Sequence, residues 1–250
     1  MEVMELFHPQ ISVQVGEYEL AEGIELKMCS DKATYFDWAK IKFTEQMQPA
    51  LKLARKEPAR ILLGYDGVME EIFTGFVSRP YNSVGADEIA LKDEMLRLEE
   101  TVINHTFVDT TPQEIITFCL NRAGVTKIQL APQGYPVRRQ AVFRQMNVIE
   151  AINRVQAIWG IKHRFFFLGG TFYWGVKPPQ EKVYTFEYGV NILSLKRFGG
   201  MWELETAAAP FIHHSQQIEI VHPKIYGVVE VQKVITGTND HGFIRTRIYF

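Results

Sequence analysis

The sequence has few cysteines and no long hydrophobic run. Its two cysteines, Cys29 and Cys119, fit neither a CxxC metal pair nor a disulfide framework, so we expect both to be small buried residues. No stretch approaches the roughly 18 apolar residues of a membrane span, and no membrane insertion is expected. The first ten residues, MEVMELFHPQ, contain two glutamates and no apolar signal-peptide core. They predict synthesis and folding in a reducing cytoplasm.

The chain also lacks a strong net charge, because 27 Lys and Arg residues nearly balance 29 Asp and Glu residues. A net charge of −2 provides no global field for gathering nucleic acid or an anionic membrane. One basic stretch, VRRQAVFRQMN (137–147), surrounds an aromatic residue. Arg138, Arg139 and Arg144 with Phe143 are one option for contacting a polyanion, and a solvated linker is the simpler interpretation. No recognition of a nucleic-acid sequence is expected.

Motifs for nucleophilic catalysis and phosphate binding are missing as well. There is no GxSxG sequence and no glycine-rich phosphate loop. The acidic pairs at 70–71 and 99–100 are adjacent in sequence, so on a strand their side chains would point to opposite faces. His213 and His214, even with His222, match no zinc-ligand spacing. We therefore predict no catalytic residue, no cofactor, no metal site and no enzymatic activity.

Short alternating segments dominate residues 1–105. The segments ISVQV (11–15) and IELKM (24–28) each place apolar residues on one face. FDWAKIKF (36–43) alternates with a phase slip, which predicts a bulge near Ala39–Lys40. RILLGYDG and EEIFTGFVS flank an Asp66-Gly67 turn. Strands of this length and spacing favour a small β-barrel or β-sandwich.

Two helices are predicted in the middle of the chain. The first begins with Thr111 as N-cap, Pro112 at the first helical position and Glu114 completing a capping box. The second begins after Asn147 and ends at Gly160, and both carry one apolar stripe.

An aromatic hairpin follows the second helix. Gly169-Gly170 joins two short strands, which is a strong two-residue turn signal. Aromatic residues occupy both faces of these strands, which favours a buried core or an interface over a stacking platform for a ligand. They are Phe165, Phe166, Phe167, Phe172, Tyr173 and Trp174.

The β pattern returns after Pro178-Pro179, which block both helix and central strand. The fold class is therefore predicted as α+β and β-rich, with two tube-like β-barrel modules flanking a helix-helix-hairpin portion. The expected parts are an N-terminal barrel at 1–105, an α+β middle at 106–178 and a C-terminal barrel at 179–250.

The order of these blocks resembles the late-control protein D family, the baseplate hub proteins of phage tails, which also covers the base of type VI secretion spikes. The resemblance rests on several stretches in order. They are RILLGYDGVMEEIFTGFVS, KDEMLRLEET, TPQEIITFCLNRAGV, NVIEAINRVQAIWGIKHRFFFLGGTFYWG, YGVNILSLKR and HPKIYGVVEVQKVITGTNDHGFIRTRIYF. The last stretch carries His222-Pro223, Gly227, Val231, Gly242-Phe243 and Arg245-Thr246.

The resemblance implies a homotrimeric hub in the virion tail that joins a hexameric tail tube to a trimeric spike. Its expected partners are further copies of itself, a tail tube protein and a spike or tail-tip protein. Two alternatives stay open, a receptor- or glycan-binding tail module that uses Tyr173 or Trp174, and a cell-wall hydrolase. In a hub, the strand 242–250 would complete a barrel or pair at a subunit edge, with Phe250 largely buried in the assembled form. Ile244, Thr246, Ile248 and Phe250 are expected on one face of this strand, and Arg245 and Arg247 on the other.

Overall fold

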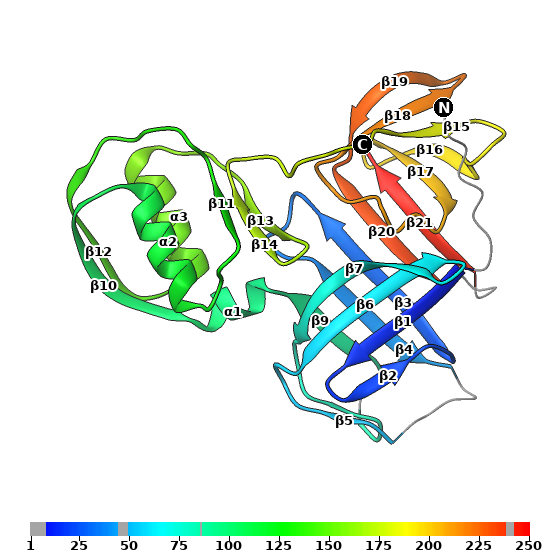
Figure 1. Cartoon of the computed structure of the whole chain (residues 1–250), viewed down its shortest axis with the longest axis horizontal. Helices are drawn as coiled ribbons and strands as arrows, with labels where there is room; N and C mark the ends of the chain where they lie inside the picture. The colour runs from blue at the N-terminus through cyan, green and yellow to red at the C-terminus, as the bar shows by residue number, and fades with distance from the viewer. Residues whose placement is uncertain (1–8, 45–49, 86, 239–242) are drawn as a thin grey trace. The chain divides into compact units, whose positions relative to one another are not determined.

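Strands make up most of the protein in the computed structural model, which describes residues 9–44, 50–85, 87–238 and 243–250 (Figure 1). The β-rich α+β class is confirmed. Contacts divide the chain into unit 1, Met1–Asp93 with Pro178–Phe250, and unit 2, Glu94–Lys177. The three-part division at 105 and 178 stays a prediction. Among the described residues no helix is long and apolar enough to cross a membrane.

Unit 1 contains two β modules. The first module comprises β1 (Pro9–Val15), β2 (Tyr18–Leu20), β3 (Ile24–Asp31), β4 (Trp38–Phe43), β5 (Lys52–Leu53), β6 (Pro58–Tyr65), β7 (Val68–Val77), β8 (Tyr81–Asn82) and β9 (Ile89–Asp93). The second module comprises β15 (Tyr184–Glu187), β16 (Ser194–Phe198), β17 (Met201–Ala207), β18 (Gln217–His222), β19 (Ile225–Glu230), β20 (Lys233–Thr238) and β21 (Ile244–Tyr249).

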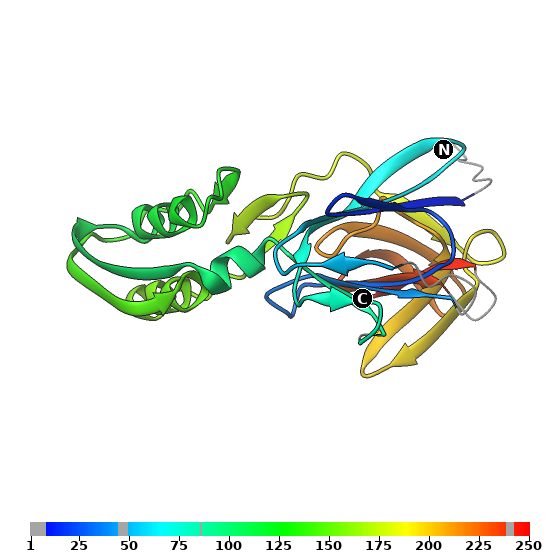
Figure 2. The ribbon, with the colours of Figure 1, turned by 90° about the horizontal axis from the view of Figure 1, so that it is seen from below.

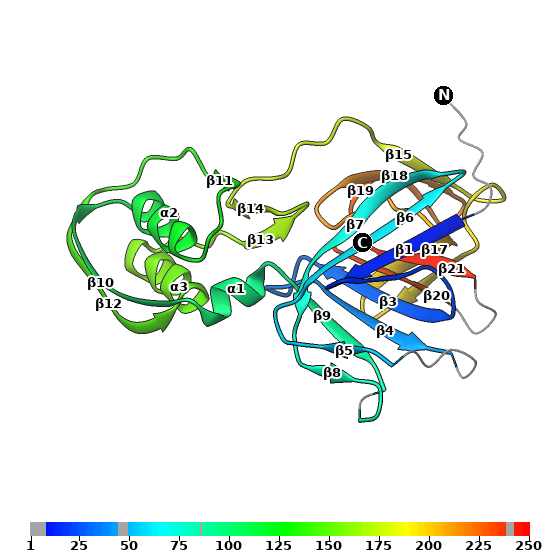
Figure 3. The ribbon, with the colours of Figure 1, turned by 60° about the horizontal axis from the view of Figure 1, so that its bottom comes forward.

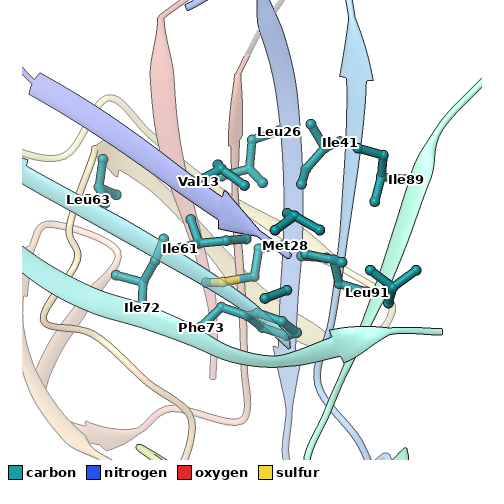
Figure 4. Close-up of a cluster of buried hydrophobic side chains, with 14 of the residues drawn as sticks. Val13, Leu26, Met28, Ile41, Ile61, Leu63, Ile72, Phe73, Ile89 and Leu91 are labelled. Carbon is teal, nitrogen blue, oxygen red and sulfur yellow. The ribbon is translucent and has the colours of Figure 1, made fainter. Parts of the chain in front are cut away.

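One sheet passes through both modules. Its strand order is β16-β17-β21-β20-β3-β4-β9-β7-β6-β1-β2, and a second sheet has the order β15-β18-β19. Each module has its own apolar cluster. In the first, Val13, Leu26, Ile41, Ile61 and Leu91 converge from different strands, as Figure 4 shows. Along such strands, core-facing and outward-facing residues alternate, because successive side chains point to opposite faces of the sheet.

The predicted bulge in β4 is wrong. β4 pairs with β3 and with β9 in a continuous register from Trp38 onward. Ala39 and Ile41 are the buried residues, and Phe36 lies before the strand begins. Lys92 Nζ lies 3.9 Å from the centre of the Phe36 ring. The phase slip in the sequence therefore reflects an aromatic outside the strand, not an extra residue within it.

Two strand glycines in the first module allow close approach of backbones. A Cβ atom on Gly75 of β7 would lie 2.2 Å from the Lys92 carbonyl oxygen of β9. One on Gly64 would lie 1.9 Å from the Val68 carbonyl oxygen. Both contacts are far below van der Waals distance, so only glycine fits these positions.

Replacing Gly75 with alanine should therefore destabilise unit 1. The added methyl group forces β7 and β9 apart, and overpacking of this kind costs about 1–3 kcal/mol. Gly85→Ala is the matched control, because a Cβ there meets nothing within 4 Å. Urea unfolding of both variants measures the difference, and equal midpoints would contradict the close approach.

Unit 2 packs two helices on a two-stranded ribbon (Figure 3). Its elements are α1 (Met95–Glu100), β10 (Val102–Thr110), α2 (Pro112–Arg122), β11 (Ile128–Leu130), β12 (Arg138–Asn147), α3 (Val148–Trp159), β13 (Phe165–Leu168) and β14 (Thr171–Trp174). The ribbon pairs β10 with β12, and a small sheet has the order β11-β14-β13. Figure 2 shows α2 and α3 in this unit from a second direction.

Both predicted helices form as expected. Thr111 and Asn147 are the N-caps, each within a capping box that Glu114 or Glu150 completes. Gly160 ends α3 in the left-handed conformation. The segment 137–147, interpreted as a solvated linker, contains β12, which pairs with β10 in the ribbon.

Candidate assembly surfaces

The two β modules repeat one pattern of strand neighbours. In the first module, the order β3-β4-β9-β7-β6 follows the sheet. In the second, β16-β17-β21-β20 takes the place of β3-β4-β9-β7, and the pairing of β19 with β18 takes the place of β7 with β6. The single strand β7 thus corresponds to two consecutive strands, β19 and β20, which lie in different sheets. The repeat ends there, because β1 runs antiparallel to β6 whereas β15 runs parallel to β18.

The modules meet where β20 pairs with β3. Lys233 to Gly237 lie opposite Asp31 to Lys27 in antiparallel register. The Lys233 Nζ atom lies 3.3 Å from Asp31 Oδ2, and Lys32 forms an ion pair with Glu230. Backbone pairing and partly buried ion pairs therefore hold this seam together.

Two buried carboxyl groups lie beside the seam. The Asp37 N–H group donates to Asp93 Oδ2 at 3.0 Å, and the Asp93 N–H group donates to the Asp37 carbonyl oxygen at 3.0 Å. The Asp31 N–H group donates to Asp37 Oδ1 at 3.1 Å. Burial disfavours the charged form and raises the pKa of Asp37 to about 7.

The paired histidines lie in the second module. His214 is buried, and its Nδ1 lies 2.9 Å from Ser215 Oγ. Burial lowers the pKa of both His213 and His214 to about 4. His222 lies at the end of β18, where its ring contacts Tyr188. No group of three or more His, Cys, Asp and Glu side chains in the described part of the chain is arranged to hold a metal ion.

The C-terminal strand is central, not peripheral. β21 pairs with β17 on one side and with β20 on the other, as Figure 1 shows. Ile244, Thr246 and Ile248 are buried, whereas Arg247 is exposed, which confirms the predicted faces. Phe250 is half-buried in the single chain. Gly242, part of the motif that carried the resemblance, lies outside the described residues.

The eleven-stranded sheet ends at β16 and at β2. β16 pairs only with β17, and β2 only with β1, within the residues that the structure describes. β16 occupies the position in its module that β3 occupies in the first, yet β3 has β20 on its second side. Unpaired N–H and C=O groups on an edge strand form a template for another strand. The β16 edge is therefore the first candidate assembly surface.

The aromatic hairpin does not form a ligand platform. All six aromatic residues of β13 and β14 are buried, and Trp174 is completely inaccessible. The stacked pair Phe166 and Tyr173 has ring centres 5.6 Å apart. A glycan-binding face that uses Tyr173 or Trp174 has no support from this arrangement, and the expected core role is confirmed.

The basic stretch lies on β12 with its arginines exposed. Arg138, Arg139 and Arg144 face solvent, and Phe143 between them is fully buried. Phe143 packs against Phe107 of β10, with ring centres 5.6 Å apart. This stretch therefore carries charge on a strand, without an exposed aromatic for stacking on a base.

No protein-family model and no curated protein sequence matches this chain. Solved structures share its fold at low sequence identity. The 43 kDa tail protein of prophage MuSo2 from Shewanella oneidensis is 10% identical, with a TM-score of 0.73 over 97% of this chain and 98% of that one. A tail protein from Neisseria meningitidis MC58 is 12% identical, with a TM-score of 0.70 over 97% and 96%.

A third similar structure comes from a secretion system. The Escherichia coli c3393 protein, a component of the type VI secretion system, is 12% identical and has a TM-score of 0.69. The similarity covers 95% of this chain and 75% of that protein. The chain thus has the fold of phage tail proteins and of a component of a related secretion machine.

Proposed function

We propose that this chain is a structural, non-catalytic hub of a phage tail or phage-like injection machine. It assembles as a ring of three copies that joins a six-fold tail tube to a trimeric spike. The observation that carries the proposal is the repeated strand order, with one sheet running through both modules. The shared fold with tail proteins and with a type VI component supports the same role.

The repeat explains how three copies could match six-fold symmetry. Each chain contributes two modules that share part of their strand order, so three chains present six similar positions. One ring face can then bind a hexameric tube protein, while the differences between the modules suit a three-fold spike. The virion tail is the proposed location.

The β20–β3 pairing suggests how the copies join. Inside one chain, β20 covers one side of β3. β16 is the counterpart of β3, and its corresponding side has no strand partner among the described residues. In the proposed ring, a neighbouring copy covers β16 as β20 covers β3. This head-to-tail contact closes a ring when the rotation between copies is one third of a turn.

The mass of the assembled protein tests the proposal directly. Light scattering on a gel-filtration column should give three times the chain mass, and electron micrographs should show rings with three-fold symmetry. A chain that stays monomeric or dimeric up to high protein concentration would count against a ring of three copies.

Two proline variants test the β16 edge. In an antiparallel strand, the backbone N–H and C=O groups of one residue bond to the partner strand, and those of the next residue point away from it. Of Lys196→Pro and Arg197→Pro, one therefore breaks the pairing with β17, and the other removes only an outward N–H group. The variant that keeps the wild-type melting temperature should lose assembly. Lys196→Ala and Arg197→Ala are the matched controls, and a stable proline variant that still assembles refutes pairing at β16.

A further inference from the structure

The two units carry opposite net charges. Residues 94–177 contain ten Lys and Arg against six Asp and Glu, which gives unit 2 a net charge of +4. The rest of the chain contains 17 Lys and Arg against 23 Asp and Glu, which gives unit 1 a net charge of −6. The near-neutral net charge of the chain is therefore the sum of a basic unit and an acidic unit, and such an asymmetry indicates binding to a partner of opposite charge.

The positive charge of unit 2 gathers along β12 and α3. We name Arg138, Arg139, Arg144 and Arg154 the arginine strip, and all four are exposed. Arg138 and Arg144 start from one face of β12 and Arg139 from the other, so among the described residues the strip follows the free edge of this strand. Arg154 Nε donates to the Val142 carbonyl oxygen of β12 at 3.1 Å, which places the α3 side chain against that strand.

The ends of the strip are held in place while its charges stay unpaired. Arg138 donates through Nη2 to the Ile158 carbonyl oxygen near the end of α3, at 3.2 Å. No ion pair joins any of the four arginines to a carboxylate in the part of the chain that the structure describes. Because the guanidinium group always carries its charge, the strip attracts an acidic surface at any physiological pH.

Two valines lie on the uncovered face of the ribbon, among polar side chains. The helices pack on the side of the ribbon that carries Phe143. On the opposite side, Thr106 lies across from Val142, and Val108 lies across from Gln140. Val108 is 68% exposed. Apolar side chains beside arginines are typical of protein interfaces, whereas binding to nucleic acid relies on phosphates and stacked bases.

Unpaired acidic side chains lie together in unit 1. Glu17, Glu19 and Glu22 are exposed on and around β2, the last strand of the eleven-stranded sheet. Glu19 accepts a hydrogen bond from the Ser12 hydroxyl at 3.1 Å. None of the three glutamates forms an ion pair within the described ranges. We name residues 17–22 the glutamate hairpin.

We propose that the arginine strip of one copy docks on the glutamate hairpin of a second copy. The inference rests on the proposed ring and adds to it a contact through unit 2, separate from the β16 edge. Opposite charges steer the copies together, and Val108 and Val142 on the uncovered ribbon face supply apolar contact. Unit 2 thus acts as a clamp on the neighbouring chain.

Charge reversal in the full-length chain tests the clamp. Arg139→Glu with Arg144→Glu should weaken self-association about tenfold in 50 mM salt, because two exposed ion pairs together are worth about one order of magnitude in the association constant. Glu17→Lys with Glu22→Lys should weaken it by a similar factor. Carrying all four changes on one chain should restore association. Sedimentation equilibrium measures the constant, and 500 mM salt should remove the differences because of screening.

The control variant changes the net charge by the same amount as Arg139→Glu with Arg144→Glu, but at sites outside the arginine strip. Lys127→Glu with Lys162→Glu replaces two exposed basic residues of unit 2 outside the strip and should leave association unchanged. An equal loss in this control would overturn the clamp, because net charge alone would explain it. Failure of the four-fold variant to regain association would overturn it as well.

Other outcomes separate the clamp from the ring. If the wild type forms a three-copy ring and charge reversal has no effect, the clamp is wrong and the ring stands. If the wild type is monomeric at every concentration and salt, both fail. If reversal at Arg139 and Arg144 abolishes binding to a 20-base-pair DNA duplex without changing self-association, the strip serves a nucleic acid and the clamp is wrong.

Discussion

Deleting residues 244–250 should leave unit 1 unfolded. β21 lies between β17 and β20, so its loss opens the sheet in the middle of the second module. Ile244, Ile248 and Tyr249 are buried, and each large apolar side chain contributes about 1.5–3 kcal/mol. Their sum approaches the whole stability of an ordinary domain, about 5–15 kcal/mol.

Circular dichroism and thermal melting measure this effect. The truncated chain should lose the cooperative transition of unit 1, and the helical signal of unit 2 should survive because unit 2 contains no residue beyond Lys177. Arg247→Ala is the control, since that side chain is exposed. A truncated chain that melts like the wild type would contradict the central position of β21.

The dependence of stability on pH should have two opposing components. Burial raises the pKa of Asp37 from its ordinary value of 3.8 to about 7. Between these two pH values the folded state keeps a proton on this carboxyl group, whereas the unfolded state has released it. This contribution is present at low pH and is lost as the pH rises to 7, by up to about 4 kcal/mol. Burial lowers the pKa of His214 to about 4. Its contribution is present above 6.5 and is lost as the pH falls to 4, by up to about 3 kcal/mol.

Single substitutions should separate these components. Relative to the wild type, Asp37→Asn should gain stability steadily from pH 4 to pH 7, at about 1.4 kcal/mol per pH unit. His214→Gln should show the reverse trend between pH 6.5 and pH 4. Urea midpoints across this range provide the measurement, with exposed Asp87→Asn as the control. A constant difference between Asp37→Asn and wild type would show that the carboxyl group titrates normally.

The helices were predictable because their signals are local. Thr111 with Glu114, and Asn147 with Glu150, lie three residues apart, and both capping boxes form. The glycine turn at 169–170 is equally local, with positive φ at both residues. Hydrogen-bonding and conformational preferences within a few residues decide such features, whatever the rest of the chain does.

Pairing between distant strands could not be predicted in the same way. β12 was interpreted as a linker because its partner strand, β10, comes from a distant part of the chain that begins at Val102. Such pairing leaves little pattern within β12 itself. The seam joins Asp31 to Lys233, which no local preference specifies. The alternation in β21 fixed which residues are buried, but it could not show that strands lie on both sides.

The candidate surfaces were only partly visible in the sequence. The basic stretch was recognised, whereas Arg154 joins it through the fold, because α3 packs against β12. The free edge of β16 follows from the order of the whole sheet and has no signature of its own. Surfaces that depend on arrangement in space need coordinates, even where every residue type is known.

The insertion of unit 2 between the two β modules has a consequence for synthesis on the ribosome. Unit 2 is complete at Lys177, whereas β3 gains its second partner strand only when β20 has been made. The nascent chain therefore exposes the β3 edge until β20 (Lys233–Thr238) has been made. A folded unit 2 in that interval separates the early strands from the late ones, and a chaperone that shields β3 would raise the yield of native protein.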